Sequence, residues 1–251
     1  MTNATSSSHS IEKRGSIALV QLDRAPVNAL PRHGWRQLTE SIHALSTDTA
    51  IRAVVLHGGH DRFCAGADIN ELLQPDPGAD RAAMLTVVEE AADAIGSCRV
   101  PVIAAIDGPA HGGGLELAIS CDLRVASPNA TFAAAGVNMG LIASVASLVE
   151  VAGDTVARRM LLSGERIDAP TAHRWGLVTD LDDSPLDAAI ALAESIARKP
   201  PLAIEATKAA LNSSAARDSI TDTFRRLAAT DDHREALVAF QEKRPGNFRR
   251  T

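Results

Sequence analysis

The sequence predicts an α/β core followed by a helical C-terminal part, and three observations support this fold class. In the first half of the chain, short apolar runs alternate with segments whose apolar residues have helical spacing. From residue 154 onward the pattern is helical. Two glycine-containing turns, at 63–68 and 111–114, lie where an apolar run ends and a helical segment begins. Strands and helices that alternate in this way form layered α/β structures.

The expected strands are short and apolar. Residues 16–22 alternate apolar and polar side chains, as a half-buried strand does, whereas residues 53–56 are continuously apolar, as in a fully buried strand. The full set of expected strands is 16–22, 53–56, 102–106, 123–126 and 131–133.

The expected helices carry an apolar face. In the first of them, Trp35, Leu38, Ile42 and Leu45 are spaced so that they share one side of the helix. The full set of expected helices is 35–45, 81–97, 186–197, 202–211 and 218–240, with a short helix beginning near Asp68.

These elements suggest three parts of the chain. Residues 1–10 are rich in serine and threonine and lack the apolar segment of a secretory signal, so we expect a disordered tail. Residues 11–195 are expected to form the core, and residues 196–251 a helical C-terminal region, with Pro200-Pro201 marking a break between helices. The chain has 251 residues, 45% of them hydrophobic, which is enough for one sizeable core.

Composition argues against several classes of protein. A net charge of −6 and a low aromatic content of 3% are unlike a nucleic-acid or anionic-membrane binder. No apolar run is long enough to span a bilayer. The three cysteines have no zinc-site spacing and are expected to be reduced thiols, which favours a cytoplasmic protein.

The most informative segment is 111–118, which reads His-Gly-Gly-Gly-Leu-Glu-Leu-Ala. It follows an apolar run and opens an Ala-rich helical pattern, so its glycines lie at a strand-to-helix turn. Backbone N–H groups at a helix start have no intrahelical acceptor and favour negative charge. Glu116 follows within the first helical turn, which places an acid/base group beside a candidate oxyanion site.

The segment 63–68 has the same local sequence pattern, because small residues again separate an apolar run from a helix. Two such turns could each offer one N–H to the same oxygen, which is what a thioester carbonyl needs when it becomes an enolate. Taken singly, each turn is more simply explained as ordinary α/β structure.

Together and in this order, the motifs resemble the crotonase superfamily of enoyl-CoA hydratases and isomerases. The resemblance is carried by Phe-Cys-Ala-Gly-Ala-Asp-Ile at 63–69, by the stretch 101–118, and by Cys-Asp-Leu-Arg-Val-Ala at 121–126. It extends from residues 27–30, through 162–167 and 175–178, to 240–245, and so covers nearly the whole chain. It implies a spiral of ββα repeats with a C-terminal helical trimerisation region, and a homotrimer or homohexamer. It also implies an acyl-CoA substrate, so that CoA belongs to the substrate and neither a separate cofactor nor a metal is expected.

The resemblance assigns roles to individual residues. Glu116 matches an acid/base position of the family's hydratases, and Ala67 and Gly113 match the two residues whose N–H groups hold the thioester oxygen. Positions expected to contact the substrate or its CoA are Ala65, Asp68, Gly112, Phe240 and Lys243, of which the last two often reach a neighbouring subunit's CoA.

One position departs from the family's hydratases, which use a second glutamate where this chain has Gly136. The stretch 142–148 also lacks the Gly-rich, Thr/Arg-containing sequence of many relatives. Enoyl-CoA hydration is the leading interpretation. The alternatives are an isomerase or another enolate-forming enzyme, and a protein that binds acyl-CoA with little catalysis. The polar residues His111, Asn138 and Ser144 could substitute for the missing carboxylate, although a structural role is favoured for each.

Other motif interpretations are weaker. His57-Gly58-Gly59-His60 offers two metal-binding side chains without an evident third ligand, so a turn is favoured. The triple glycine lacks the spacing of a dinucleotide fingerprint or a P-loop. The chain contains no Gly-x-Ser-x-Gly elbow, and the serines near Ser144 and Ser213 are interpreted as helix packing and capping.

Overall fold

The main sheet organises the molecule. The computed structural model describes residues 7–73, 82–142, 144–213 and 217–251. Within them, six strands form one sheet in the order β1-β2-β4-β6-β8-β11, in which β1 is antiparallel to β2 and the other pairs are parallel. The strands of this sheet are β1 His9–Arg14, β2 Ile17–Leu22, β4 Ala53–His57, β6 Val102–Ile106, β8 Leu123–Ala126 and β11 Asp180–Leu181.

A ββα unit repeats along the core. Each of β4, β6 and β8 is followed by a short strand outside the main sheet and then by helical structure. The short strands are β5 Gly66–Ala67, β7 Pro109–His111 and β9 Thr131–Ala133. They stack as the main strands do, because β7 pairs with β9 in parallel and Cys64 forms a parallel bridge to Ala110. Successive repeats therefore advance along two parallel ladders, which confirms the predicted spiral of ββα units.

Two further short strands pair outside the main sheet: β3 Ala29–Leu30 lies beside β5, and β10 Ile167–Asp168 lies beside β9.

Helices follow the short strands and close each repeat. The helices of this part are α1 Arg32–Thr47, α2 Ile69–Leu73, α3 Ala82–Gly96, α4 Gly113–Ser120, the 3₁₀ turn η1 Val137–Met139, α5 Val145–Ser163 and α6 Ala169–Arg174.

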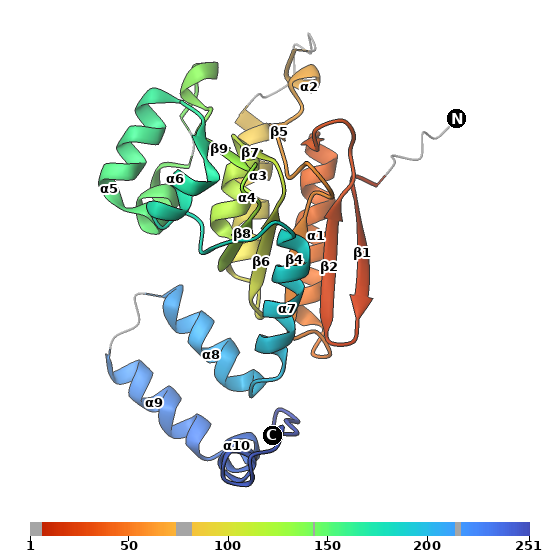
Figure 1. Ribbon diagram of the computed structural model, residues 1–251, viewed down its shortest axis with the longest axis vertical. Helices are drawn as coiled ribbons and strands as arrows, with labels where there is room; N and C mark the ends of the chain where they lie inside the picture. The colour runs from red at the N-terminus through yellow and green to blue at the C-terminus, as the bar shows by residue number, and fades with distance from the viewer. Residues whose placement is uncertain (1–6, 74–81, 143, 214–216) are drawn as a thin grey trace.

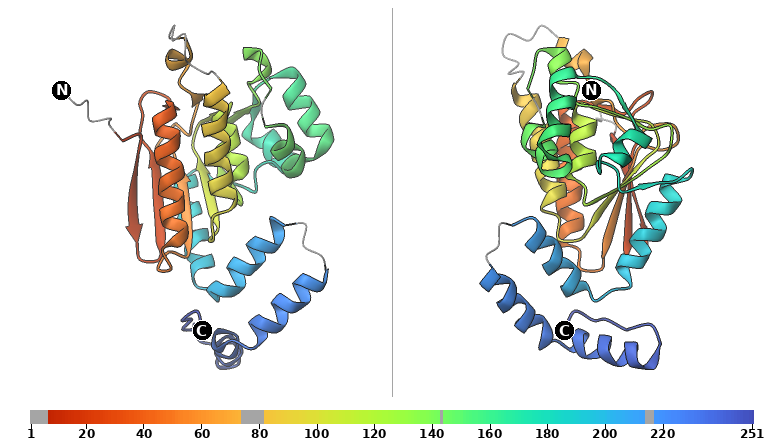
Figure 2. Two further views of the ribbon diagram at one scale, coloured as in Figure 1. Left: turned by 180° about the vertical axis from the view of Figure 1, so that it is seen from behind. Right: turned by 60° about the vertical axis from the view of Figure 1, so that its left-hand side comes forward.

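The central strands of the main sheet are buried on both faces. Val54, Leu56 and Ala104 belong to the larger core, which includes the buried face of α1, whereas Val55 and Ala105 pack toward α7 (Pro185–Ala197). Figure 2 shows α7 on one side of the sheet and the long helices α1 and α3 on the other. A strand covered on both faces has no polar side to alternate with, which explains the continuous apolar runs in the sequence.

Several boundaries differ from the sequence expectation. Residues 9–10, expected in the tail, open the edge strand β1, while residues 1–6 lie outside the described residues. Only His9 of β1 is buried, so the strand carries no apolar alternation that could have predicted it. The segment 218–240 forms two helices, α9 (Arg217–Ala228) and α10 (Asp231–Glu242), because Thr230 accepts from the N–H of His233 and caps a new helix. The predicted boundary at 195/196 falls inside the last turn of α7.

The C-terminal helices are attached to the core through α8 (Pro201–Leu211). The Lys208 ammonium, 5% exposed, donates to the carbonyls of Ile95 and Val100 and to Asp122 Oδ2 at 2.7 Å. Beyond α8, α9 and α10 extend away from the sheet (Figure 1). No helix in the described ranges is long and apolar enough to cross a membrane.

Candidate active site

The two glycine-containing turns lie against each other. The N–H of His111 donates to the Cys64 carbonyl at 3.1 Å, and the N–H of Cys64 donates to the Pro109 carbonyl at 3.0 Å. Gly66 has φ +97°, and a Cβ on it would lie 2.9 Å from both the Gly113 nitrogen and the His111 oxygen. Only glycine allows this close approach. Segments about 45 residues apart in the sequence are thus joined at the position predicted for the oxyanion site.

The three glycines at 112–114 serve different purposes. Gly112 precedes α4 with φ 53°, so it makes the turn from strand to helix in a conformation that favours glycine. A Cβ on Gly114 would lie 1.9 Å from the Cys64 carbonyl oxygen. Because glycine has only a hydrogen at this point, α4 can pack against the turn at 63–68. Gly113 begins α4, where N–H groups have no intrahelical acceptor. The site residues Ala67 and Gly113 therefore lie on adjoining backbone segments.

Glu116 lies in the first turn of α4 and is largely removed from solvent. Its side chain sits in a segment whose neighbours Leu115 and Leu117 are fully buried, and the residue is 8% exposed. The Ser147 hydroxyl, from the first turn of α5, donates to Glu116 Oε1 at 2.8 Å. A carboxylate near a helix N-terminus is favoured by the helix dipole, and here it also has a hydroxyl partner.

Ser147 was not anticipated from the sequence. The local signal is a hydroxyl at the third position of a helix, in a stretch where the other residues are apolar except Ser144. Its contact with Glu116 joins residues 31 positions apart and depends on how α5 packs against α4.

Asp68 is engaged in holding the first turn. Arg24 Nη2 donates to Asp68 Oδ2 at 2.7 Å, and the N–H of Asn70 donates to Oδ1. Partial burial by itself raises the pKa of Asp68, but the hydrogen bonds from Arg24 and the backbone outweigh it, so the pKa is lowered. Nearby, the N–H of Ala65 donates to the Val27 carbonyl at 3.0 Å. The carboxylate and this N–H are thus used to position the turn that carries Ala67.

The three polar candidates for the missing carboxylate occupy other positions. His111 Nε2 hydrogen-bonds with Thr131 Oγ1 at 3.0 Å, and burial lowers the pKa of this imidazole. Asn138 donates to the Gly164 carbonyl at 2.8 Å, where α5 ends. Ser144 is the N-cap residue of α5, as the capping interpretation expected, but its side chain makes no capping hydrogen bond. The bonds of His111 and Asn138 agree with the structural role favoured for them.

Gly136 provides no acid/base group, and its backbone has no need of glycine. It has φ −54° and ψ −46°, which any residue can adopt. Its carbonyl accepts from the N–H groups of Met139 and Leu141 and closes the turn η1.

The predicted C-terminal contacts, Phe240 and Lys243, are not brought near Glu116 in one copy of the chain. Phe240 is 87% exposed on α10, and Lys243 is the left-handed residue that ends this helix. Figure 1 places α10 at the opposite end of the molecule from α2 and well away from α4, which carries Glu116. In an oligomer, these two side chains could therefore contact only the site of a neighbouring subunit.

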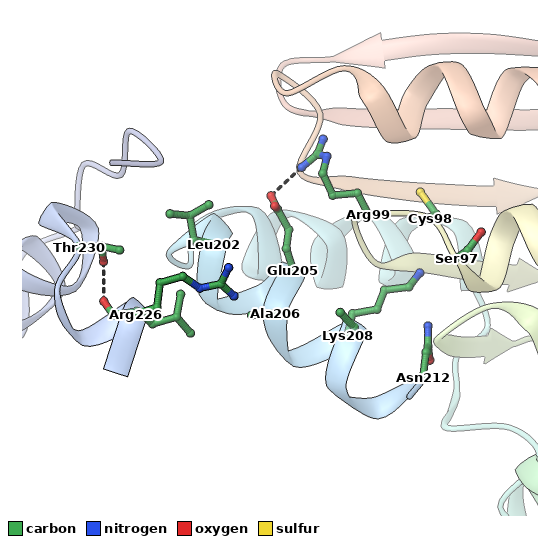
Figure 3. A pocket seen from close by; sticks show the side chains of 12 residues that line it. Ser97, Cys98, Arg99, Leu202, Glu205, Ala206, Lys208, Asn212, Arg226 and Thr230 are labelled. Atoms are coloured by element: carbon green, nitrogen blue, oxygen red, sulfur yellow. Dashed lines mark hydrogen bonds and ion pairs between the residues drawn. The ribbon is translucent and has the colours of Figure 1, made fainter. Parts of the chain in front are cut away.

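Two further features lie outside this site. His60 and Asp61, both exposed, form a cluster with the half-buried Asp107. His60 Nδ1 lies 2.9 Å from Asp107 Oδ2, and this hydrogen bond raises the pKa of His60. A cavity of about 570 Å³ lies between α8, α9 and the end of α3. Figure 3 shows Arg99, Glu205 and Lys208 along it, and both Arg99 and Lys208 are paired with carboxylates, at Glu205 and Asp122.

Comparisons with known proteins agree on one family. The sequence model of the family described as "Enoyl-CoA hydratase/isomerase" matches residues 12–251. The chain is 35% identical to a 2,3-dehydroadipyl-CoA hydratase of Escherichia coli (strain K12), over 95% of this chain and 97% of that protein. It is 36% identical to an (E)-benzylidenesuccinyl-CoA hydratase of Thauera aromatica, over 95% and 98% of the two chains.

Solved structures give the same result for the fold. Pseudomonas aeruginosa DspI superposes with a TM-score of 0.89 at 35% identity, covering 99% of this chain and 100% of that one. An enoyl-CoA hydratase from Bacillus anthracis superposes with a TM-score of 0.92 at 27% identity, covering 97% and 100%.

Proposed function

The chain belongs to the enoyl-CoA hydratase/isomerase family, and on this premise we propose that Glu116, Ala67 and Gly113 carry out the hydration of a 2-enoyl-CoA. The chain is an acyl-CoA enzyme of the hydratase type, as the sequence motifs predicted. The observation that carries the residue assignment is the contact between the two glycine turns, with Glu116 in the helical turn that follows.

The proposed reaction uses the two turns to hold negative charge. The N–H groups of Ala67 and Gly113 donate to the thioester oxygen and polarise the conjugated double bond. A water oxygen bonds to the β-carbon while Glu116 takes one proton from that water, and the π electrons move toward the thioester oxygen to give an enolate. The enolate then collapses, and the α-carbon takes the proton from Glu116. One carboxylate thus removes and returns a proton, and it ends in its starting state.

The two alternative functions are not favoured. The relatives that match over most of both chains are named hydratases, which argues against an isomerase as the main activity. A non-catalytic acyl-CoA binder would have no need of a buried carboxylate beside the glycine turns, and Glu116 is such a group.

The test is direct. The protein is mixed with a short trans-2-enoyl-CoA, and loss of the conjugated thioester absorbance is followed. Glu116→Gln is expected to lower kcat by about 100-fold or more, because the only proposed proton-transfer group is removed. Glu89→Gln, an exposed carboxylate on α3, is the matched control and should leave kcat unchanged. Absence of hydration at high protein concentration, or full activity of Glu116→Gln, would reject the proposal.

The CoA part of the substrate is proposed to lie along the two glycine turns and to reach a neighbouring subunit. The subunit that holds Glu116 and the thioester would contribute Ala65, Asp68 and Gly112. The neighbouring subunit would contribute Phe240 and Lys243. A lysine suits the nucleotide phosphates of CoA, and its position at an exposed helix end leaves it accessible.

The oligomer is proposed to be a homotrimer or homohexamer formed through the C-terminal helices. Large apolar side chains are exposed on α9 and α10, which supports a contact there. These side chains are Ile220, Phe224, Leu237, Val238 and Phe240. The three cysteines are buried and unpaired, which supports a reducing compartment such as the cytoplasm.

A further inference from the structure

The hydrogen bond from Ser147 to Glu116 Oε1 is the feature from which a further role follows. It is 2.8 Å long and joins a hydroxyl to the carboxylate proposed to transfer the proton. Ser147 itself lies in the stretch 142–148, and it was assigned no role from the sequence.

The fold fixes the position of Ser147. It is the third residue of α5, and the adjoining residue Leu148 is fully buried in the main core. The N–H of Leu148 donates to the Ser144 carbonyl at 3.0 Å, which closes the first helical turn around Ser147. The hydroxyl is therefore held by a packed helical turn.

The hydrogen bond also determines which carboxylate oxygen of Glu116 is free to exchange a proton. A hydroxyl that donates to Oε1 fixes the rotation of the carboxylate and satisfies one oxygen, so that Oε2 is left to exchange a proton. Burial of Glu116 makes such a partner more important, because a carboxylate with few solvent contacts depends on protein donors.

Because Gly136 has no side chain, position 136 offers no second carboxylate, and Glu116 has to carry out both proton transfers. If one carboxylate must take a proton from water and deliver it to the α-carbon, its reactive oxygen has to face both atoms in turn. A freely rotating carboxylate would spend only part of its time in that orientation.

We propose that Ser147 is a positioning residue that holds the Glu116 carboxylate with Oε2 toward the substrate. The inference rests on the proposed hydration by Glu116. Ser147 keeps its own proton throughout and forms no bond to the substrate, so the balance of the reaction is unchanged.

The first test compares kcat and KM. Ser147→Ala is expected to lower kcat by about 10-fold to 100-fold, with KM changed by less than about twofold, because orientation and not binding is lost. Ser147→Thr keeps the hydroxyl and is expected to recover most of kcat. Ser163→Ala removes a hydroxyl from the other end of the same helix, where it bonds to the Arg159 carbonyl, and should leave kcat unchanged.

The second test asks whether Ser147 acts through Glu116. In a Glu116→Asp background the carboxylate is retained but drawn back from the hydroxyl, so adding Ser147→Ala should change kcat by less than about twofold. If the two effects multiply, Ser147 acts independently and the inference is wrong. It is equally wrong if folded Ser147→Ala has the wild-type kcat, or if Ser147→Thr is as impaired as Ser147→Ala.

Failure of the proposed function would look different. In that case the wild-type protein would not hydrate the enoyl-CoA at all. Exchange of the α-protons of a saturated acyl-CoA in D₂O, followed by NMR, would then report on Glu116 and Ser147 without the water-addition step. Loss of this exchange in Ser147→Ala supports the positioning role, and unchanged exchange overturns it.

Discussion

Gly136 is a residue at which a side chain can be added without straining the backbone. Its φ and ψ are those of an ordinary helical residue, and its hydrogen bonds to Met139 and Leu141 use only its carbonyl. A side chain at this position therefore introduces no backbone strain.

Gly136→Glu is expected to increase the rate of hydration. A second carboxylate would divide the removal of the water proton and the protonation of the α-carbon between two groups, which corresponds to a rise in kcat of about 10-fold to 100-fold. The rate is measured with the same trans-2-enoyl-CoA. Gly136→Gln has nearly the same size without the charge and should give no increase, and an equal gain in both variants would contradict this explanation.

Gly114→Ala is expected to destabilise the protein and remove its activity. The new methyl group would meet the Cys64 carbonyl at 1.9 Å, so the two glycine turns must move apart. Overpacking of this kind costs about 3 kcal/mol of unfolding free energy, measured by urea titration, and kcat should fall with it. Gly96→Ala, with nothing within 4 Å of its new Cβ, is the control and should stay within about 1 kcal/mol of wild type. A Gly114→Ala protein as stable as wild type would contradict the close approach.

At the scale of elements, the buried strands were predictable and the edge and minor strands were not. The expected range 102–106 coincides with β6, because a strand in a covered sheet is marked by continuous apolar residues. The expected ranges 123–126 and 131–133 also coincide with β8 and β9. The edge strand β1 exposes most of its side chains, and β3, β5 and β10 are two residues long, so their sequences carry no periodic signal. The glycine turns could be predicted from local sequence, but their mutual contact depends on the stacking of repeats.

Helix α5 shows why part of the site could not be predicted. Gly153 has φ 79° and interrupts the helix, so apolar spacing does not continue through it. Sequence patterns therefore indicated helix only from residue 154, and the turn that carries Ser147 lies before this point. The contact with Glu116 requires knowledge of how the first half of α5 packs on α4.

Two ion pairs attach α8 to the core, Arg99–Glu205 and Lys208–Asp122, and the Lys208 side chain is the more deeply buried cation. Lys208→Met would leave Asp122 and the carbonyls of Ile95 and Val100 without their cation, which costs about 3–5 kcal/mol of unfolding free energy. Urea titration of the folded protein measures the loss. Lys199→Met, at an exposed position just after α7, is the control and should have little effect. Equal stability of the two variants would show that Lys208 contributes nothing to this attachment.

At the scale of the whole molecule, the C-terminal helices extend from the core with apolar side chains uncovered (Figure 1). If they form the subunit contact, light scattering on a sizing column should give a mass of three or six chains. Phe224→Asp places a charge on the exposed apolar face of α9 and is expected to lower that mass toward one chain. A wild-type protein that elutes as a single chain would contradict this assembly.

Lys243 connects assembly to substrate binding. It ends α10, which Figure 1 shows well away from α4, the helix of Glu116, so the proposed contact with CoA is made across a subunit boundary. Lys243→Ala is expected to raise KM for an enoyl-CoA by about 10-fold, because a charge-assisted contact to phosphate is lost. A thioester of N-acetylcysteamine lacks the nucleotide, so its KM should not change. Lys199→Ala removes a lysine outside α10 and serves as the control for net charge. Equal effects of Lys243→Ala on both thioesters would show that Lys243 does not contact the nucleotide. An effect confined to the CoA thioester would show that each site uses the α10 helix of a neighbouring subunit to bind CoA.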